Sequence, residues 1–356
     1  MRNALALTSI LVFCSSSAWA DGSFTGRTRF DLDRTEIQSF VESAAAANNM
    51  APLDVYRLLA KAEPQPKIIE LISKPAEKVS PWWEYRERFL TEQRVAEGAQ
   101  FMREHRARLE KAQKETGVAP EYVVAIIGVE TFYGRITGKY RVLDALATLA
   151  FDYPPRADYF RSELGQFIAL AREEAVDPMT AMGSYAGAMG AGQFMPSSYR
   201  RYAVDGGNDD KRNLFADWDD IIASVANYFK ESGWVKGGPV LAEAVVQADA
   251  PVSADPANLA LNDTVAGLKA KGVEFDTGEA ETARVLLIPA EQQDGPSYRV
   301  GFKNFEVITR YNRSVRYAMA VHDLATTIAG RVAAAAPAVP GETKLAAQPE
   351  SATVAR

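Results

Sequence analysis

The segment from Tyr122 to Glu130 constrains the fold of this chain more than any other. Its sequence, YVVAIIGVE, is almost entirely apolar until the final residue. At about 100° per residue in a helix, Glu130 shares the inward face of Val123 and Ile126. A carboxyl group held there loses hydration, which raises its pKa and suits it to protonate a glycosidic oxygen. The segment therefore predicts a buried helix ending in a candidate acid for sugar cleavage. The alternative is a helix-end Glu that reaches solvent or pairs with an arginine.

The first twenty residues have the features of a signal peptide. Arg2 precedes an apolar stretch, 4–14, and Ala18-Trp19-Ala20 supplies the small-x-small pattern of a cleavage site. The apolar stretch is short for a permanent membrane span. Cleavage after Ala20 would remove Cys14, the only cysteine, so the mature chain must be stabilised by an ordinary core without disulfides.

Cys14 raises the alternative of a lipid anchor, because bacterial lipoproteins carry a lipidated cysteine after the apolar stretch. Here the bulky Phe13 stands where a small residue is expected. We therefore expect a cleaved, periplasmic protein rather than an outer-membrane lipoprotein. At the other end, residues 331–356 are rich in Ala and Pro without apolar periodicity, which predicts a disordered tail.

Charge and composition exclude several classes of function. A formal net charge of −6 lacks the basic surface of a nucleic-acid-binding protein. The chain has two histidines, His105 and His322, in segments typical of helices, so histidine-based zinc sites and Ser-His-Asp triads are poorly supported. Nor does Ser184 lie in a G-x-S-x-G turn, because Met182 occupies the first glycine position.

The pattern of apolar residues predicts a mainly α protein that is α+β overall. We expect an N-terminal helical domain at 28–118, a catalytic core at 119–232, a small α+β insertion at 233–301 and C-terminal helices at 302–330. Expected helices include 142–149, 156–175, 218–229, 265–271, 305–311 and 315–329. Expected strands are 240–246, 283–288 and 298–302.

No second carboxylate accompanies Glu130 in the sequence, although hydrolysis of a glycoside by water normally requires two. Glu121 lies nine positions earlier on the same helix and faces roughly the opposite way. Nothing marks Asp144 or Asp152 as a partner. A single acid suffices if the sugar supplies the nucleophile, with an N-acetyl group stabilising the cation and the 6-hydroxyl closing an anhydro ring.

The glycine-dense block 183–199, GSYAGAMGAGQFMPSSY, is the second notable segment. It lacks the Lys-Ser/Thr and strand context of a phosphate loop or dinucleotide fingerprint. A structural turn before a helix explains glycines alone. The interleaved Ser184, Gln193, Phe194 and Met195 instead suit a groove with polar and apolar contacts for sugars.

Together, segments 125–134 and 183–199, the SVANYF and GW runs at 224–234 and the VITRYN run at 307–312 resemble the membrane-bound lytic murein transglycosylase B family. The resemblance covers about Phe30 to Gly330. It implies a lysozyme-like core with flanking α and small β domains. It also implies cleavage of the MurNAc–GlcNAc bond of peptidoglycan with formation of 1,6-anhydroMurNAc ends.

The family's single catalytic acid/base matches Glu130. Its substrate-groove residues match Tyr85, Arg156, Ser184, Gln193, Phe194, Met195, Tyr228, Tyr311, Asn312 and Tyr317. The partners implied are peptidoglycan glycan strands, with other cell-wall enzymes as further candidates, and we expect a monomer that requires no cofactor.

Some members of this family carry a calcium loop where residues 205–216 lie here. Asp205 and Asp209 keep the first and fifth positions. Asp210 replaces the turn glycine at the sixth position, and Ala216 replaces the bidentate acid at the twelfth. Asp217 compensates only in part. We therefore expect a solvated acidic loop rather than a calcium site.

Two other functions remain open from the sequence. A lysozyme-type hydrolase would use water and a second carboxylate, and its product would be heavier by one water. A catalytically idle peptidoglycan-binding scaffold would recruit other enzymes; the presence of Glu130 among intact groove residues argues against it.

Overall fold

The structure is a computed structural model that describes residues 28–74 and 80–335. The predicted signal peptide and Cys14 lie outside these residues, as does the tail beyond residue 335. The sequence predicts that residues 331–335 belong to the tail, but they continue α14 (Val315–Ala335), so the predicted boundary is wrong. Among the described residues, no helix is both long and apolar enough to cross a membrane.

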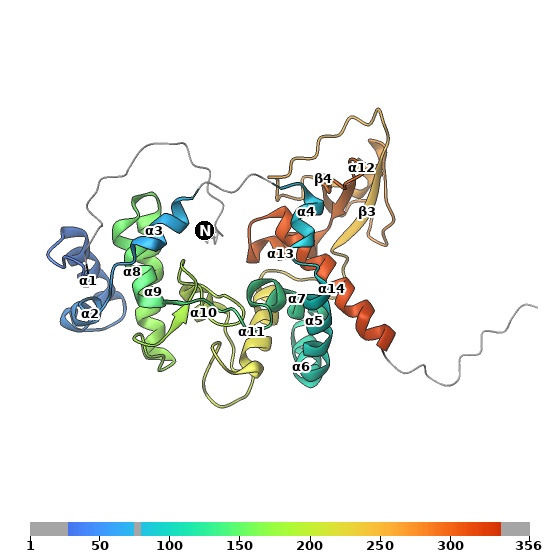
Figure 1. Ribbon diagram of the computed structural model, residues 1–356. Coiled ribbons are helices and arrows are strands. Elements are labelled where there is room, and N and C mark those ends of the chain that lie inside the picture. The colour runs from blue at the N-terminus through green and yellow to red at the C-terminus, as the bar shows by residue number, and fades with distance from the viewer. Residues whose placement is uncertain (1–27, 75–79, 336–356) are drawn as a thin grey trace, which may run out of the picture.

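Helices make up most of the described chain (Figure 1). They are α1 (Thr35–Ala47), α2 (Pro52–Leu59), α3 (Pro66–Ser73), α4 (Trp82–Glu87), α5 (Glu92–Glu104), α6 (Arg106–Thr116), α7 (Pro120–Thr131), α8 (Val142–Asp152), α9 (Ala157–Glu173), α10 (Pro196–Tyr202), α11 (Trp218–Glu231), α12 (Val265–Ala270), α13 (Lys303–Tyr311) and α14 (Val315–Ala335), with a 3-10 turn η1 (Pro154–Arg156). The strands are β1 (Tyr140–Arg141), β2 (Met182–Gly183), β3 (Leu241–Val246), β4 (Asp263–Thr264), β5 (Val273–Glu274), β6 (Arg284–Pro289) and β7 (Tyr298–Gly301).

Helix α7 lies at the centre of the core. Pro120 occupies its first turn, where a missing N–H costs nothing. Every residue from Tyr122 to Gly128 is buried, because α5, α6, α11 and α14 all pack around it. The helix is therefore apolar on all sides rather than amphipathic. It ends at Thr131, and the next two residues, Phe132 (φ 52°) and Tyr133 (φ 60°), adopt the left-handed conformation.

The predicted N-terminal domain packs in two parts. Helices α1 and α3 lie beside α8 and α9, whereas α5 and α6 pack around α7, at the other side of the molecule (Figure 1). Two buried carboxylates fasten the first part. Asp152 accepts a hydrogen bond from Arg34 Nη1 at 2.7 Å, and Asp144 accepts one from the backbone N–H of Glu63 at 2.9 Å. Asp144 and Asp152 are therefore structural anchors.

The predicted insertion forms an antiparallel sheet with the strand order β4-β6-β7-β3-β5. The three predicted strands match β3, β6 and β7 to within one residue at each end, and the predicted helix matches α12. One face carries a small core of its own around Val265, Leu268 and Val300. On β6, Leu286 and Ile288 instead join the main core, so the sheet is fastened to the helical body.

Candidate active site

Glu130 lies in the last turn of α7 with its carboxyl group against α14. Tyr317 of α14 donates a hydrogen bond from its hydroxyl to Glu130 Oε1 at 2.6 Å. Burial raises the pKa of Glu130 to about 7, although the hydrogen bond from Tyr317 favours the carboxylate and acts in the opposite direction. The carboxyl therefore exchanges its proton near neutral pH, as general acid–base catalysis requires.

The protonation pattern of this pair follows from its surroundings. Burial raises the pKa of Tyr317 well above its ordinary value, and the neighbouring Glu130 acts in the same direction, so the phenol keeps its proton. The Tyr317 hydroxyl donates its hydrogen bond to Oε1 of Glu130. When the Glu130 carboxyl is neutral, its proton is therefore on Oε2. Among the described residues no arginine or lysine forms an ion pair with Glu130, so the alternative of an arginine-paired Glu is wrong.

Glu130 lines a cavity of about 240 Å³. The other lining residues are Tyr159, Ser184, Tyr185, Ala186, Ala188, Gln193, Phe194, Met195, Ser198, Tyr228, Tyr311 and Asn312. Glu130 is the one carboxylic acid in this set. The wall combines hydroxyls and amides with aromatic rings, which is a lining suited to sugar rings.

The glycine-dense block builds one wall of the cavity by folding back on itself. Met189 and Phe194 exchange backbone hydrogen bonds of 2.9 Å across a tight turn. Gly190 has φ 69°, and a Cβ there would lie 2.1 Å from the carbonyl oxygen of Leu214, so only glycine fits. Gln193 adopts φ 51° in the same turn, and its side-chain amide donates to the carbonyl of Thr137 at 3.0 Å.

Thr131 connects this wall to α7. Its buried hydroxyl donates to the carbonyl oxygen of Ala191 at 2.8 Å and accepts from the N–H of Gly134 at 3.0 Å. Thr131, which follows Glu130 in the chain, is thus hydrogen-bonded directly to Ala191 of the glycine-dense block. This contact fixes the distance between the acid and the opposite wall.

Aromatic side chains form another wall. The rings of Tyr228 and Tyr311 lie 4.7 Å apart between centroids, and Phe194 packs edge-on against each of them. The Tyr228 hydroxyl donates to the carbonyl of Arg310, and the Tyr311 hydroxyl donates to the carbonyl of Gly192. Both phenols are therefore held by backbone groups, which fixes the shape of the wall.

Seven of the ten groove residues taken from the family resemblance line the cavity, and three lie beyond its lining. Tyr317 contacts Glu130 itself. Arg156 is one step away, with its guanidinium 4.4 Å from the ring centroid of Tyr159. Tyr85 lies on α4, with the guanidinium of Arg316 at 5.3 Å from its ring centroid.

Sequence reasoning missed several lining residues. Tyr185, Ala186, Ala188 and Ser198 belong to the glycine-dense block, so their position in that segment was a usable signal. Tyr159 had no comparable signal. It reaches the cavity because α9 passes beside it, which the local sequence does not specify.

The acidic loop 205–217 is held in its conformation by hydrogen bonds to other groups of the protein. Asp205 accepts hydrogen bonds from the backbone N–H groups of residues 208–210. Asp220, which is buried, accepts from Gly206 and Asn213, while Lys111 Nζ donates to the carbonyl of Gly206 at 2.7 Å. No group of three or more Asp, Glu, His or Cys side chains that could hold a metal occurs in the described part of the chain.

Comparison with known proteins agrees with this geometry. Residues 33–326 match the family described as Transglycosylase SLT domain. The chain belongs to this family. It is 40% identical over 300 residues to membrane-bound lytic murein transglycosylase B of Escherichia coli strain K12, covering 84% of this chain and 79% of that protein. The protein is accordingly an enzyme of the lytic murein transglycosylase type.

Solved structures support the same assignment. The catenated lytic transglycosylase SltB1 of Pseudomonas aeruginosa superposes with a TM-score of 0.81 at 44% identity, covering 84% of this chain and 98% of that one. Escherichia coli Slt35 in complex with calcium gives 0.77 at 38% identity, with 86% and 97% covered. Pseudomonas aeruginosa SltB3 in complex with NAG-anhNAM-pentapeptide gives 0.74 at 30% identity, with 82% and 78% covered. The lysozyme-like helical fold expected from the sequence is confirmed.

Proposed function

We propose that the chain cleaves the MurNAc-β-1,4-GlcNAc bond of peptidoglycan with Glu130 as its only acid/base, forming 1,6-anhydroMurNAc ends. The observation that carries this proposal is a single carboxylic acid with a pKa of about 7 in a cavity otherwise lined by neutral polar and aromatic groups. The complex of SltB3 with an anhydro muropeptide supports the same substrate class.

In the first step, Glu130 gives its proton to the glycosidic oxygen. The bond from C1 of MurNAc to that oxygen breaks, and GlcNAc leaves with a free 4-hydroxyl. The N-acetyl carbonyl of MurNAc stabilises the positive charge at C1. In the second step, the 6-hydroxyl oxygen attacks C1 and its proton passes to Glu130, which restores the acid. No water is consumed, and the two products together have the mass of the substrate.

A lysozyme-type hydrolase is the less supported candidate. It would need a second carboxylate near the scissile bond to activate water. Within the described residues, Asp144 and Asp152 are occupied as structural anchors, and Glu130 is the one carboxyl among the cavity-lining groups.

The test is mass spectrometry of muropeptides released from purified peptidoglycan by the mature chain and by Glu130→Gln. We expect anhydro products from the wild type and a release at least about 10²-fold slower from the variant. Products with reducing ends would establish hydrolysis instead. Binding of peptidoglycan without any product from the wild type would favour the scaffold.

We also propose that the enzyme acts in the periplasm after cleavage at Ala20, without a lipid and without calcium. The membrane-bound relative supports a place in the cell envelope. Amino-terminal sequencing and intact mass of the protein isolated from cells test the processing. A chain beginning at Asp21 supports it, whereas a lipidated Cys14 at the amino terminus contradicts it.

A further inference from the structure

Beyond the cavity, three elements meet at one buried carboxylate. Asp323 of α14 accepts a hydrogen bond from Arg86 Nε of α4 at 2.6 Å and another from Arg299 Nη1 of β7 at 2.8 Å. Arg299 also forms an ion pair of 2.8 Å with Glu243 of β3. Asp323 and Arg299 are 6% and 8% exposed, so this contact lies inside the protein. We call these four residues the Asp323 cluster.

The Asp323 cluster is balanced but vulnerable. Its two guanidinium groups and two carboxylates sum to zero charge, and each shared hydrogen bond is charge-assisted. Removal of one partner from a buried pair leaves an uncompensated charge. The free-energy cost of that charge exceeds the stabilisation that the pair provides. The cluster therefore holds α4, α14 and β7 in one arrangement.

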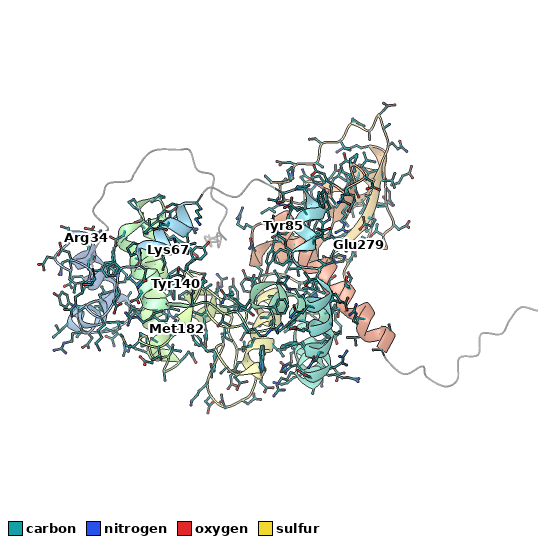
Figure 2. The ribbon with its side chains drawn as sticks, viewed as in Figure 1. Arg34, Lys67, Tyr85, Tyr140, Met182 and Glu279 are labelled. Carbon is teal, nitrogen blue, oxygen red and sulfur yellow. The ribbon has the colours of Figure 1, made fainter. Side chains whose placement is uncertain are left out.

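Both helices in this arrangement carry tyrosines that belong to the surroundings of Glu130. On α14, Tyr317 lies six residues before Asp323 and donates to Glu130. On α4, Tyr85 immediately precedes Arg86. Figure 2 shows Tyr85 on the side of the molecule that carries the sheet, away from Tyr140 and Met182.

Trp82 of α4 transmits the constraint within that helix. Its ring is 2% exposed and lies 5.6 Å from the Arg299 guanidinium, and it stacks on Tyr85 with centroids 6.3 Å apart. Tyr85 is thus linked to the cluster in two ways. Arg86 follows it directly on the backbone of α4, and the Trp82 ring stacks on its ring while lying near the Arg299 guanidinium. Tyr85 is also close to the donor of Glu130, because the Arg316 guanidinium lies 5.3 Å from the Tyr85 ring centroid and Arg316 directly precedes Tyr317 on α14.

We propose that Asp323 is a positioning residue that, through Arg86 and Arg299, fixes α4 against α14 and so sets the place of Tyr85 relative to Glu130 for glycan binding. The effect reaches the substrate through Tyr85; Asp323 itself touches no reacting atom. This inference rests on the proposed cleavage of peptidoglycan at Glu130 and on the glycan contact that the family resemblance implies for Tyr85.

The test measures glycan affinity in a background that does not turn over. Binding of a NAG–NAM oligomer is compared by calorimetry for Glu130→Gln alone and with Asp323→Asn, Tyr85→Ala or both added. We expect Asp323→Asn and Tyr85→Ala each to weaken binding about ten-fold, and the combined variant to be no weaker than Tyr85→Ala within two-fold. Glu243→Gln is the matched control, because Glu243 is the exposed member of the cluster, and we expect it to change affinity less than two-fold.

Arg86→Ala repeats the test from the other partner. Arg86 is partly exposed, and its loss leaves Asp323 paired with Arg299, so this variant should fold even if Asp323→Asn does not. It should weaken binding as Asp323→Asn does. The proposal is overturned if the effects of Asp323→Asn and Tyr85→Ala multiply, if Arg86→Ala binds like its parent, or if Glu243→Gln is equally impaired. Because affinity is read without turnover, the result stays separate from failure of the proposed reaction, which would show as activity retained in Glu130→Gln.

Discussion

Glu130 contacts α14 and Asp323 belongs to α14, but the hydrogen-bond partners of these two carboxyl groups differ. A neutral phenol donates to Glu130, whereas two guanidinium groups donate to Asp323. A neutral donor leaves the acid able to gain and lose a proton near pH 7. Two guanidinium groups instead hold a carboxylate in place through charge-assisted hydrogen bonds. The difference shows how one helix supports a proton-transfer group and a structural anchor within two turns.

The largest effect is expected from Glu130→Gln on turnover. Loss of a general acid typically costs about 10²- to 10⁴-fold in rate, and this cavity has no second carboxyl to compensate. The rate of anhydro-muropeptide release should fall in that range while the thermal transition is retained. Glu121→Gln, near the start of the same helix, should keep full activity. Comparable losses in both variants would show a folding defect instead of lost acid catalysis.

The difference in stability between the wild type and the same variant should depend on pH. The pKa of Glu130 is about 7 in the folded chain against an ordinary value of 4.5. Between these values the folded state holds a proton that the unfolded state releases, so the free energy of unfolding falls as pH rises through this window. Glu130→Gln removes this loss and should be more stable than wild type by up to about 3 kcal/mol at pH 8.

Denaturant unfolding at pH 4 and pH 8 measures the difference. At pH 4 both proteins carry a neutral group at position 130, so their stabilities should converge. A stability gain that is the same at both pH values would mean that packing, and not titration of Glu130, is responsible.

Tyr317→Phe should have a smaller effect and a distinct pH signature. Without the phenol, Glu130 Oε1 loses its hydrogen-bond donor, and the pKa of Glu130 rises above about 7 because that bond favoured the carboxylate. Turnover should fall about ten-fold. This corresponds to about 1.4 kcal/mol of transition-state stabilisation, lost because the phenol no longer orients the Glu130 carboxyl. The alkaline limb of the pH–rate profile should move upward. A limb that stays in place or moves downward would contradict the assigned role of Tyr317.

The smallest effect is expected from calcium. Loop 205–217 is closed by Asp205, Asp220 and Lys111, so millimolar calcium should shift the thermal transition by less than about 1 °C. A chelator should be equally without effect. A saturable upward shift with calcium would show that the loop opens to accept the cation, as would a calorimetric binding signal abolished by Asp205→Ala.

Much of the fold could be predicted because its signals are local. The apolar run from Tyr122 to Glu130 predicted α7, and short strand-like apolar runs predicted β3, β6 and β7 nearly to the residue. The division of residues 28–118 into two packing units was not predictable in this way. The two parts separate because they pack against different surfaces formed by α8, α9 and α14. These surfaces exist only after the chain has folded.

For the site, the sequence by itself determined that a carboxyl group would lie near the end of a buried helix and that a glycine-dense turn would carry polar and aromatic side chains of one cavity. It did so because burial and turn geometry follow from residues close together in the chain. The tertiary structure alone decided that the partner of Glu130 is a phenol from a helix near the other end of the domain, that Tyr159 reaches the cavity, and that Asp323 joins α4 to β7. Such contacts span up to 237 residues of sequence. They depend on how helices pack against one another, which no local pattern encodes.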